Sequence, residues 1–140
     1  MDIDLNYFIQ NSFQRGEYSS IDEIDKLTIN STTAIDDILS LKSLKKLQIV
    51  KMFNDEYEYP SFIDYSSLTM MSSLEELYIT ENVNIKSLDL RNLKQLTTLV
   101  LLFNSNLEEI IGLEELSNLK KIIIVGNQFN EIKNMQKYLI

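Results

Sequence analysis

Aliphatic residues recur along this chain in five short segments that share one pattern. Each segment has aliphatic side chains at its first, fourth and sixth positions: IDKLTI at 24–29, LKKLQI at 44–49, LEELYI at 74–79, LTTLVL at 96–101 and LKKIII at 119–124. The segments start 20, 30, 22 and 23 residues apart. Alternation at the last positions of each segment is typical of a short strand with one face inward. We therefore expect five similar strands, stacked in parallel because none could bury its inner face alone.

The inward positions of these strands form the predicted core. They are the fourth and sixth positions of each segment: Leu27, Ile29, Leu47, Ile49, Leu77, Ile79, Leu99, Leu101, Ile122 and Ile124. We expect these side chains to pack against one another, and we assign them no binding role.

Three of the segments continue to an asparagine three residues after the last aliphatic, at Asn82, Asn104 and Asn127. At a turn, a side-chain amide can donate to and accept from backbone groups that the curved chain leaves unpaired. The first segment has Thr32 at this place, which can replace part of that bonding, and the second has Met52, which can replace none. The predicted row of asparagines is therefore broken at the second segment.

This combination resembles the leucine-rich repeat, L-x-x-L-x-L-x-x-N-x-L, and within that family the short bacterial internalin-like class. The resemblance covers roughly residues 21–132 and is clearest in IIGLEELSNLKKIIIVGNQFNEI at 110–132. It implies a single-domain α/β solenoid, a leucine-rich-repeat coil stack with a short-stranded parallel sheet on its concave face. Residues 21–132 would form about five repeats with an irregular insertion at 53–65, and residues 1–20 and 133–140 would form terminal caps.

The composition fits one globular domain and argues against catalysis. The chain has 140 residues, of which 44% are hydrophobic and 24% charged, and it contains no cysteine and no histidine. Disulfides, thiolate chemistry and the commonest general base and metal ligand are therefore missing. Neither a glycine-rich phosphate loop nor the spacing of a calcium loop is present. We predict a non-catalytic protein with no metal and no cofactor.

The net charge of −8, from 13 basic and 21 acidic residues, disfavours nucleic acid and anionic lipid as partners, because both select basic surfaces. No apolar run approaches the roughly 20 residues that span a membrane, and the start MDIDLNYFIQ lacks the basic residues of a signal peptide. We expect a cytoplasmic protein with a protein partner, which this charge allows to be basic. Acidic pairs between the strands, such as Glu114 and Glu115, are expected on the solvated convex surface.

Outward positions on the strands would line the concave sheet. The first two strands offer polar and basic side chains, and the last two offer mostly aliphatic ones. The apolar end is interpreted in two ways: as a contact site, or as β-branched residues that favour strands or lie under the C-terminal cap. The contact residues predicted on and beside this sheet are Val50, Tyr78, Val100, Leu102, Phe103, Ile123 and Val125.

The insertion FNDEYEYPSFIDY at 53–65 is a second candidate contact element. We predict contacts from Tyr57, Tyr59 and Phe62, because aromatic side chains are common among binding hot spots. The four carboxylates of the insertion would speed association with a basic partner. In the opposite interpretation, the rings, including Tyr65, pack back onto their own repeat and fill its irregular turn.

These features together predict a non-catalytic protein-protein interaction module that uses the concave sheet and the inserted loop. An inhibitor or an immunity-type protein is one form that such a module could take. The alternative is a self-associating structural module, a homodimer joined through the apolar end of the sheet.

Overall fold

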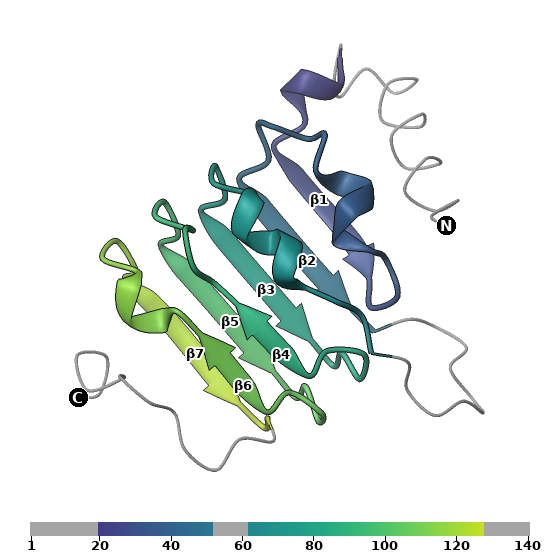
Figure 1. Cartoon of the computed structure of the whole chain (residues 1–140), viewed down its shortest axis with the longest axis vertical. Coiled ribbons are helices and arrows are strands. Elements are labelled where there is room, and N and C mark those ends of the chain that lie inside the picture. The colour runs from purple at the N-terminus through teal and green to yellow at the C-terminus, as the bar shows by residue number, and fades with distance from the viewer. Residues whose placement is uncertain (1–19, 52–61, 128–140) are drawn as a thin grey trace.

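Five short parallel strands form the main sheet of the protein (Figure 1). The computed structural model describes residues 20–51 and 62–127. Neighbouring strands are hydrogen-bonded in the order β1-β2-β3-β5-β7, and every pair is parallel. The strands are β1 (Lys26–Asn30), β2 (Lys46–Val50), β3 (Glu76–Thr80), β5 (Thr98–Leu102) and β7 (Lys121–Val125). The predicted sheet of five short parallel strands is thereby confirmed.

Equivalent positions of the repeated segments face one another across the sheet. One inward row consists of Leu27, Leu47, Leu77, Leu99 and Ile122. The next inward row consists of Ile29, Ile49, Ile79, Leu101 and Ile124. All of these residues are buried except Ile122 and Ile124, which are partly buried. Both partly buried residues belong to the edge strand β7, whereas Leu27 and Ile29 on the opposite edge strand, β1, are buried.

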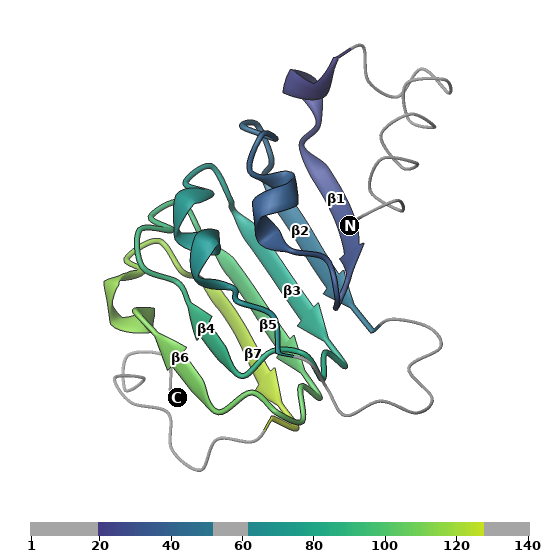
Figure 2. The same cartoon turned by 45° about the vertical axis from the view of Figure 1, so that its right-hand side comes forward.

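The segments that join the strands lie together on one face of the main sheet (Figures 1 and 2). Their helices are η2 (Ile35–Ile38), η3 (Ser66–Met70) and η4 (Leu113–Glu115). A further helix, η1 (Ile21–Glu23), precedes β1, and all four are 3-10 helices. In η2, Ile35 and Ile38 are three residues apart and both are buried, as expected for one turn of a 3-10 helix packed on a core. Strands β4 (Ser87–Asp89) and β6 (Glu109–Ile111) form a second, two-stranded parallel sheet on this face, which the repeat pattern did not predict.

Asparagine side chains tie the ends of consecutive strands together. The Asn127 Nδ2 donates to the Leu101 carbonyl at 3.0 Å, and its Oδ1 accepts from the backbone N–H of Asn104 at 3.2 Å. Asn104 repeats this arrangement one strand earlier, donating to the Ile79 carbonyl at 3.0 Å and accepting from the backbone N–H of Asn82 at 3.0 Å. The predicted role of these asparagines at the turns is confirmed.

Tyr65 continues this row of side chains toward β1. The Asn82 Nδ2 donates to the Tyr65 hydroxyl at 2.8 Å, and that hydroxyl donates to the Ser31 carbonyl at 3.1 Å. Relative exposures of 2% for Tyr65, 0% for Asn82 and 1% for Ser31 show that water does not reach this chain of bonds. The second repeated segment has Met52 in place of the asparagine, and Tyr65 instead connects Asn82 to the backbone of Ser31.

The residue before each of these asparagines has a left-handed backbone. The φ angles are 51° at Glu81, 56° at Phe103 and 71° at Gly126. Such φ values strain residues that carry a Cβ, so glycine is the residue best suited to this place. A Cβ added to Gly126 would lie only 2.4 Å from Cδ1 of Phe103, which shows that the phenylalanine ring lies directly against this glycine.

Several predictions concern residues outside the described ranges. They are the caps at 1–20, apart from Ser20, and at 133–140, Met52, and the insertion up to residue 61. In residues 20–51 and 62–127, no helix combines the length and the apolar character needed to cross a membrane.

Candidate functional site

The main sheet has one face that points away from the helices and the second sheet, and we call it the open face (Figures 1 and 2). Alternate strand residues form three rows across it. The first row is Lys26, Lys46, Glu76, Thr98 and Lys121. The middle row is Thr28, Gln48, Tyr78, Val100 and Ile123. The third row is Asn30, Val50, Thr80, Leu102 and Val125.

Polar contacts organise the part of the open face on β1, β2 and β3. The Thr28 hydroxyl donates to the Gln48 side-chain oxygen at 3.0 Å. The Tyr78 hydroxyl donates to the Glu76 carboxylate at 2.7 Å, and this hydrogen bond is the main reason that the pKa of Tyr78 is raised. The ammonium of Lys46 lies 5.1 Å from the centre of the Tyr78 ring, within the range of a cation-π interaction. Tyr78 is therefore held in place at the border between the polar and the apolar parts of the face.

Apolar side chains gather at the ends of β5 and β7. Leu102 is partly buried and pairs in register with Val125. Exposed fractions are 37% for Ile123, 49% for Val125 and 56% for Phe103. The structure thus brings together four of the predicted contact residues, and we call Leu102, Phe103, Ile123 and Val125 the apolar end. Because these side chains are already about half buried, a partner that covered one of them fully would gain about 0.5 to 1.5 kcal/mol before the costs of association.

The prediction that Val100 belongs to an exposed apolar patch is wrong. Its exposed fraction is 6%, although its side chain points to the open face. Val100 sits between Tyr78 and Ile123 in the middle row, and both of these neighbours are larger. Val50 is half-buried at the end of β2, and β3 separates this strand from the apolar end.

The inserted segment is described only from Phe62 onward, so the predicted contacts of Tyr57 and Tyr59 lie outside the described residues. Phe62 is 52% exposed, and the ammonium of Lys86 lies 5.7 Å from the centre of its ring. Lys86 directly precedes β4, so this pair belongs to the side of the second sheet. The structure therefore does not bring Phe62 together with the apolar end.

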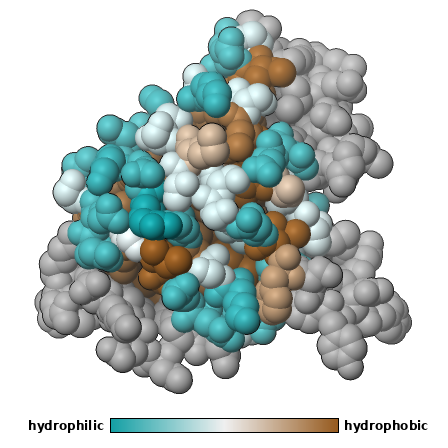
Figure 3. All heavy atoms as spheres, viewed as in Figure 1, coloured by the Kyte–Doolittle hydropathy of each residue, from teal (hydrophilic) through white to brown (hydrophobic). Residues whose placement is uncertain are grey.

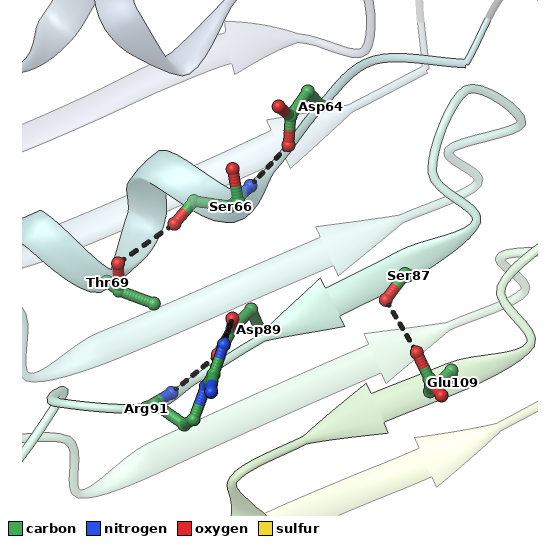
Figure 4. Close-up of polar contacts among 7 residues, drawn as sticks. All are labelled: Asp64, Ser66, Thr69, Ser87, Asp89, Arg91 and Glu109. Atoms are coloured by element: carbon green, nitrogen blue, oxygen red, sulfur yellow. Dashed lines mark hydrogen bonds and ion pairs between the residues drawn. The ribbon is translucent and has the colours of Figure 1, made fainter.

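The second sheet carries a well-formed ion pair (Figure 4). The Arg91 guanidinium donates to both carboxylate oxygens of Asp89, with its Nη2 at 2.7 Å from Oδ2. This hydrogen bonding lowers the pKa of Asp89, whose carboxylate is nearly buried. A Cβ at Gly112 would lie 2.6 Å from Cγ of Arg91, so glycine leaves the room that the arginine occupies. The pair fixes the turn after β4 and leaves the carboxylate no free edge for a ligand.

Other polar contacts on this side stabilise turns (Figure 4). The Ser87 hydroxyl donates to the Glu109 carboxylate at 3.1 Å across β4 and β6. The backbone N–H of Ser66 donates to Asp64 at 2.9 Å, and hydrogen bonds from Ser66 lower the pKa of this carboxyl. The Thr69 hydroxyl donates to the Ser66 carbonyl at 2.9 Å. In the described ranges, no group of three or more acidic side chains is placed to hold a metal ion.

Acidic side chains are concentrated away from the open face. Hydrophilic residues cover much of the side that carries the helices and the second sheet, with smaller hydrophobic areas between them (Figure 3). The acidic pairs of the connecting segments are exposed, as the sequence predicted: Asp36, Asp37, Glu108, Glu109, Glu114 and Glu115.

Two features of the structure were not assigned a role from the sequence. Tyr65 was considered only as one of several rings in the insertion, although the missing asparagine at position 52 signalled that another polar group must complete the row. Lys26 and Lys46 are among the basic outward side chains of the first two strands, and neither is one of the predicted contact residues. Their adjacent places in register across β1 and β2 could have been derived from the repeat alignment.

Neither a scan against protein-family models nor a search of the curated proteins found a match for this chain.

Proposed function

We propose that this chain is a non-catalytic module that binds a partner protein on its open face. We also propose that the main sheet is the concave sheet of a leucine-rich-repeat solenoid. The in-register strands, the asparagine row and the recurring left-handed residue before each asparagine support the second proposal. Parallel strands with one free face provide the rigid, extended surface that repeat proteins use for binding.

The apolar end is the observation that carries the binding proposal. Three large apolar side chains, those of Phe103, Ile123 and Val125, are each more than one third exposed and lie beside the partly exposed Leu102. Strands hold all but Phe103, whose left-handed backbone and contact with Gly126 fix the direction of its ring. Contiguous exposed apolar groups on a folded surface are typical of interaction sites.

The inserted loop, including Tyr57 and Tyr59, is proposed as a second contact element because it follows β2 directly. We place the protein in the cytoplasm, with no cofactor and with neither nucleic acid nor membrane as a partner. We propose that the protein acts as an inhibitor or an immunity-type protein, and this proposal rests on its small size and acidic charge. A basic partner would be drawn to the acidic surface outside the open face.

Photo-cross-linking from two positions tests the binding proposal. A photoreactive amino acid at Ile123 reports on the open face, and the same amino acid at Asp37, an exposed residue of η2, is the matched control. We expect one specific protein to be captured from position 123 and not from position 37. Equal capture from both positions, or capture from position 37 alone, would contradict a binding role of the open face.

A second candidate function, self-association, is favoured by the position of β7. This strand forms one edge of the described sheet and carries the exposed Ile123 and Val125. Two copies could join through these edges, because exposed edge strands tend to pair. Sedimentation equilibrium decides the matter: a stable dimer that Ile123→Lys converts to a monomer would assign the apolar end to assembly.

A further inference from the structure

The open face is basic although the chain is strongly acidic. Its three rows contain Lys26, Lys46 and Lys121 and a single acidic residue, Glu76. These four residues give the face a formal charge of +2, so the remaining positions of a chain at −8 carry −10. Charge is therefore separated between the open face and the rest of the molecule, and the face that carries the apolar end is the one that attracts anions.

The lysines of the open face are not neutralised within the described part of the chain. Its ion pairs are Lys45 with Glu75, Arg91 with Asp89, and Lys94 with Glu115, so none involves these three lysines. Lys26 and Lys46 face each other in register on neighbouring strands. Like charges in such positions repel, so folding brings together two cations that an added carboxylate would stabilise.

The carboxylate of Glu76 is only partly able to compensate these charges. It neighbours Lys46 in register, but it accepts the hydrogen bond of the Tyr78 hydroxyl at 2.7 Å. Lys121 lies four strands from β1, on the opposite edge strand β7, two residues before Ile123. A basic side chain would therefore meet repulsion at both ends of the first row.

The spacing of the charged and apolar groups sets the size of the ligand. Val125 is three strands across from Lys46 and four residues further along its own strand. With about 4.8 Å between strands and about 3.3 Å per residue, the two positions are about 20 Å apart. About six residues of extended chain cover that distance.

We propose that the open face binds a partner segment with acidic residues at one end and large apolar residues at the other. This inference rests on the proposed binding function and gives the chemistry of its ligand. The acidic residues lie over Lys26 and Lys46, and the apolar residues cover Ile123 and Val125. A basic partner protein can still satisfy this requirement if the segment that it presents is acidic and apolar.

A display library of random peptides of about 12 residues, roughly twice the length required, tests this inference on the full chain. We expect selection to enrich peptides that contain an acidic cluster followed or preceded by large apolar residues. Lys26→Glu combined with Lys46→Glu should lower the affinity for a synthetic peptide of that kind about tenfold, because two lysines that attract the acidic residues of the peptide become carboxylates that repel them. Lys42→Glu combined with Lys94→Glu makes the same change in net charge away from the open face and should leave the affinity unchanged.

The outcomes separate this inference from the proposed function. Enriched peptides that are basic or uncharged, and that bind equally to the Lys26→Glu, Lys46→Glu variant, overturn the acidic ligand. If their binding is still lost with Ile123→Ser combined with Val125→Ser, the open face remains a binding site. Failure to enrich any peptide overturns the inference that the ligand is a linear segment. The cross-linking experiment then remains as the test of the binding function.

Discussion

Replacing Tyr65 with phenylalanine should strongly destabilise the protein, although it removes a single oxygen. That hydroxyl accepts from Asn82 at 2.8 Å and donates to the Ser31 carbonyl at 3.1 Å, in a region where all three residues are at most 2% exposed. An unsatisfied buried polar group costs about 1 to 3 kcal/mol, and the substitution leaves two of them. Because the hydroxyl itself need no longer be dehydrated, we expect a net loss of about 2 to 4 kcal/mol in the free energy of unfolding.

Urea unfolding followed by circular dichroism measures this loss. With a typical slope of about 1 to 3 kcal/mol per molar urea, the midpoint should fall by about 1 to 2 M. Tyr78→Phe is the matched control, because its hydroxyl bonds to Glu76 on the open face, and it should change stability by about 0.5 kcal/mol or less. A double-mutant cycle with Asn82→Ala should give a coupling energy of about 1 to 2 kcal/mol. Equal effects of Tyr65→Phe and Tyr78→Phe, or strict additivity with Asn82→Ala, would refute the reasoning.

Three further predictions concern pH, a turn glycine and a buried strand residue. Burial raises the pKa of Tyr65 from 10.0 to about 12. The contribution of Tyr65 to stability is therefore fully present below pH 10, and about 3 kcal/mol of the free energy of unfolding is lost as pH rises from 10 through 12. Unfolding measured over this pH range should show the loss in the unmodified chain and not in Tyr65→Phe. Gly126→Ala should lower the free energy of unfolding by about 1 to 3 kcal/mol in thermal unfolding, because φ is 71° and the ring of Phe103 occupies the place of the added Cβ. The loss should be smaller in a Phe103→Ala background, and equal losses in both backgrounds would show that the ring does not matter. Val100→Lys should destabilise the fold by more than about 2 kcal/mol, whereas Thr98→Lys on the same strand should change stability little. Similar urea unfolding midpoints for the two variants would contradict the burial of Val100.

The main sheet could be predicted because its signal is local and repeated. Leu47 and Leu77 are 30 residues apart in sequence, yet they pair in register because each occupies the fourth position of its segment. The same alignment predicted which asparagines would bond backbone groups at the turns. The β4-β6 sheet was missed because its strands have three residues each, too few for an alternating pattern to be recognised.

The candidate site was predicted only in part, because exposure depends on neighbours that a single strand does not reveal. Val100 and Ile123 have the same outward alternation, but β5 is an inner strand and β7 is an edge strand of the described sheet. Val100 is consequently buried and Ile123 exposed. The gap at position 52 indicated that some polar group must complete the row, but it could not identify Tyr65, whose hydroxyl bonds residues 34 and 17 positions away in sequence.

The central claim is that the open face binds a partner protein, and the affinity of that partner tests it most directly. The partner captured by cross-linking is titrated by calorimetry against the unmodified chain, against Ile123→Ser with Val125→Ser, and against Asp36→Ser with Asp37→Ser on η2. Removing two partly exposed apolar side chains from a covered interface should weaken binding by about tenfold or more, and the control should leave it within about threefold. Unchanged affinity for the open-face variant, with a loss for the η2 variant, would contradict the claim.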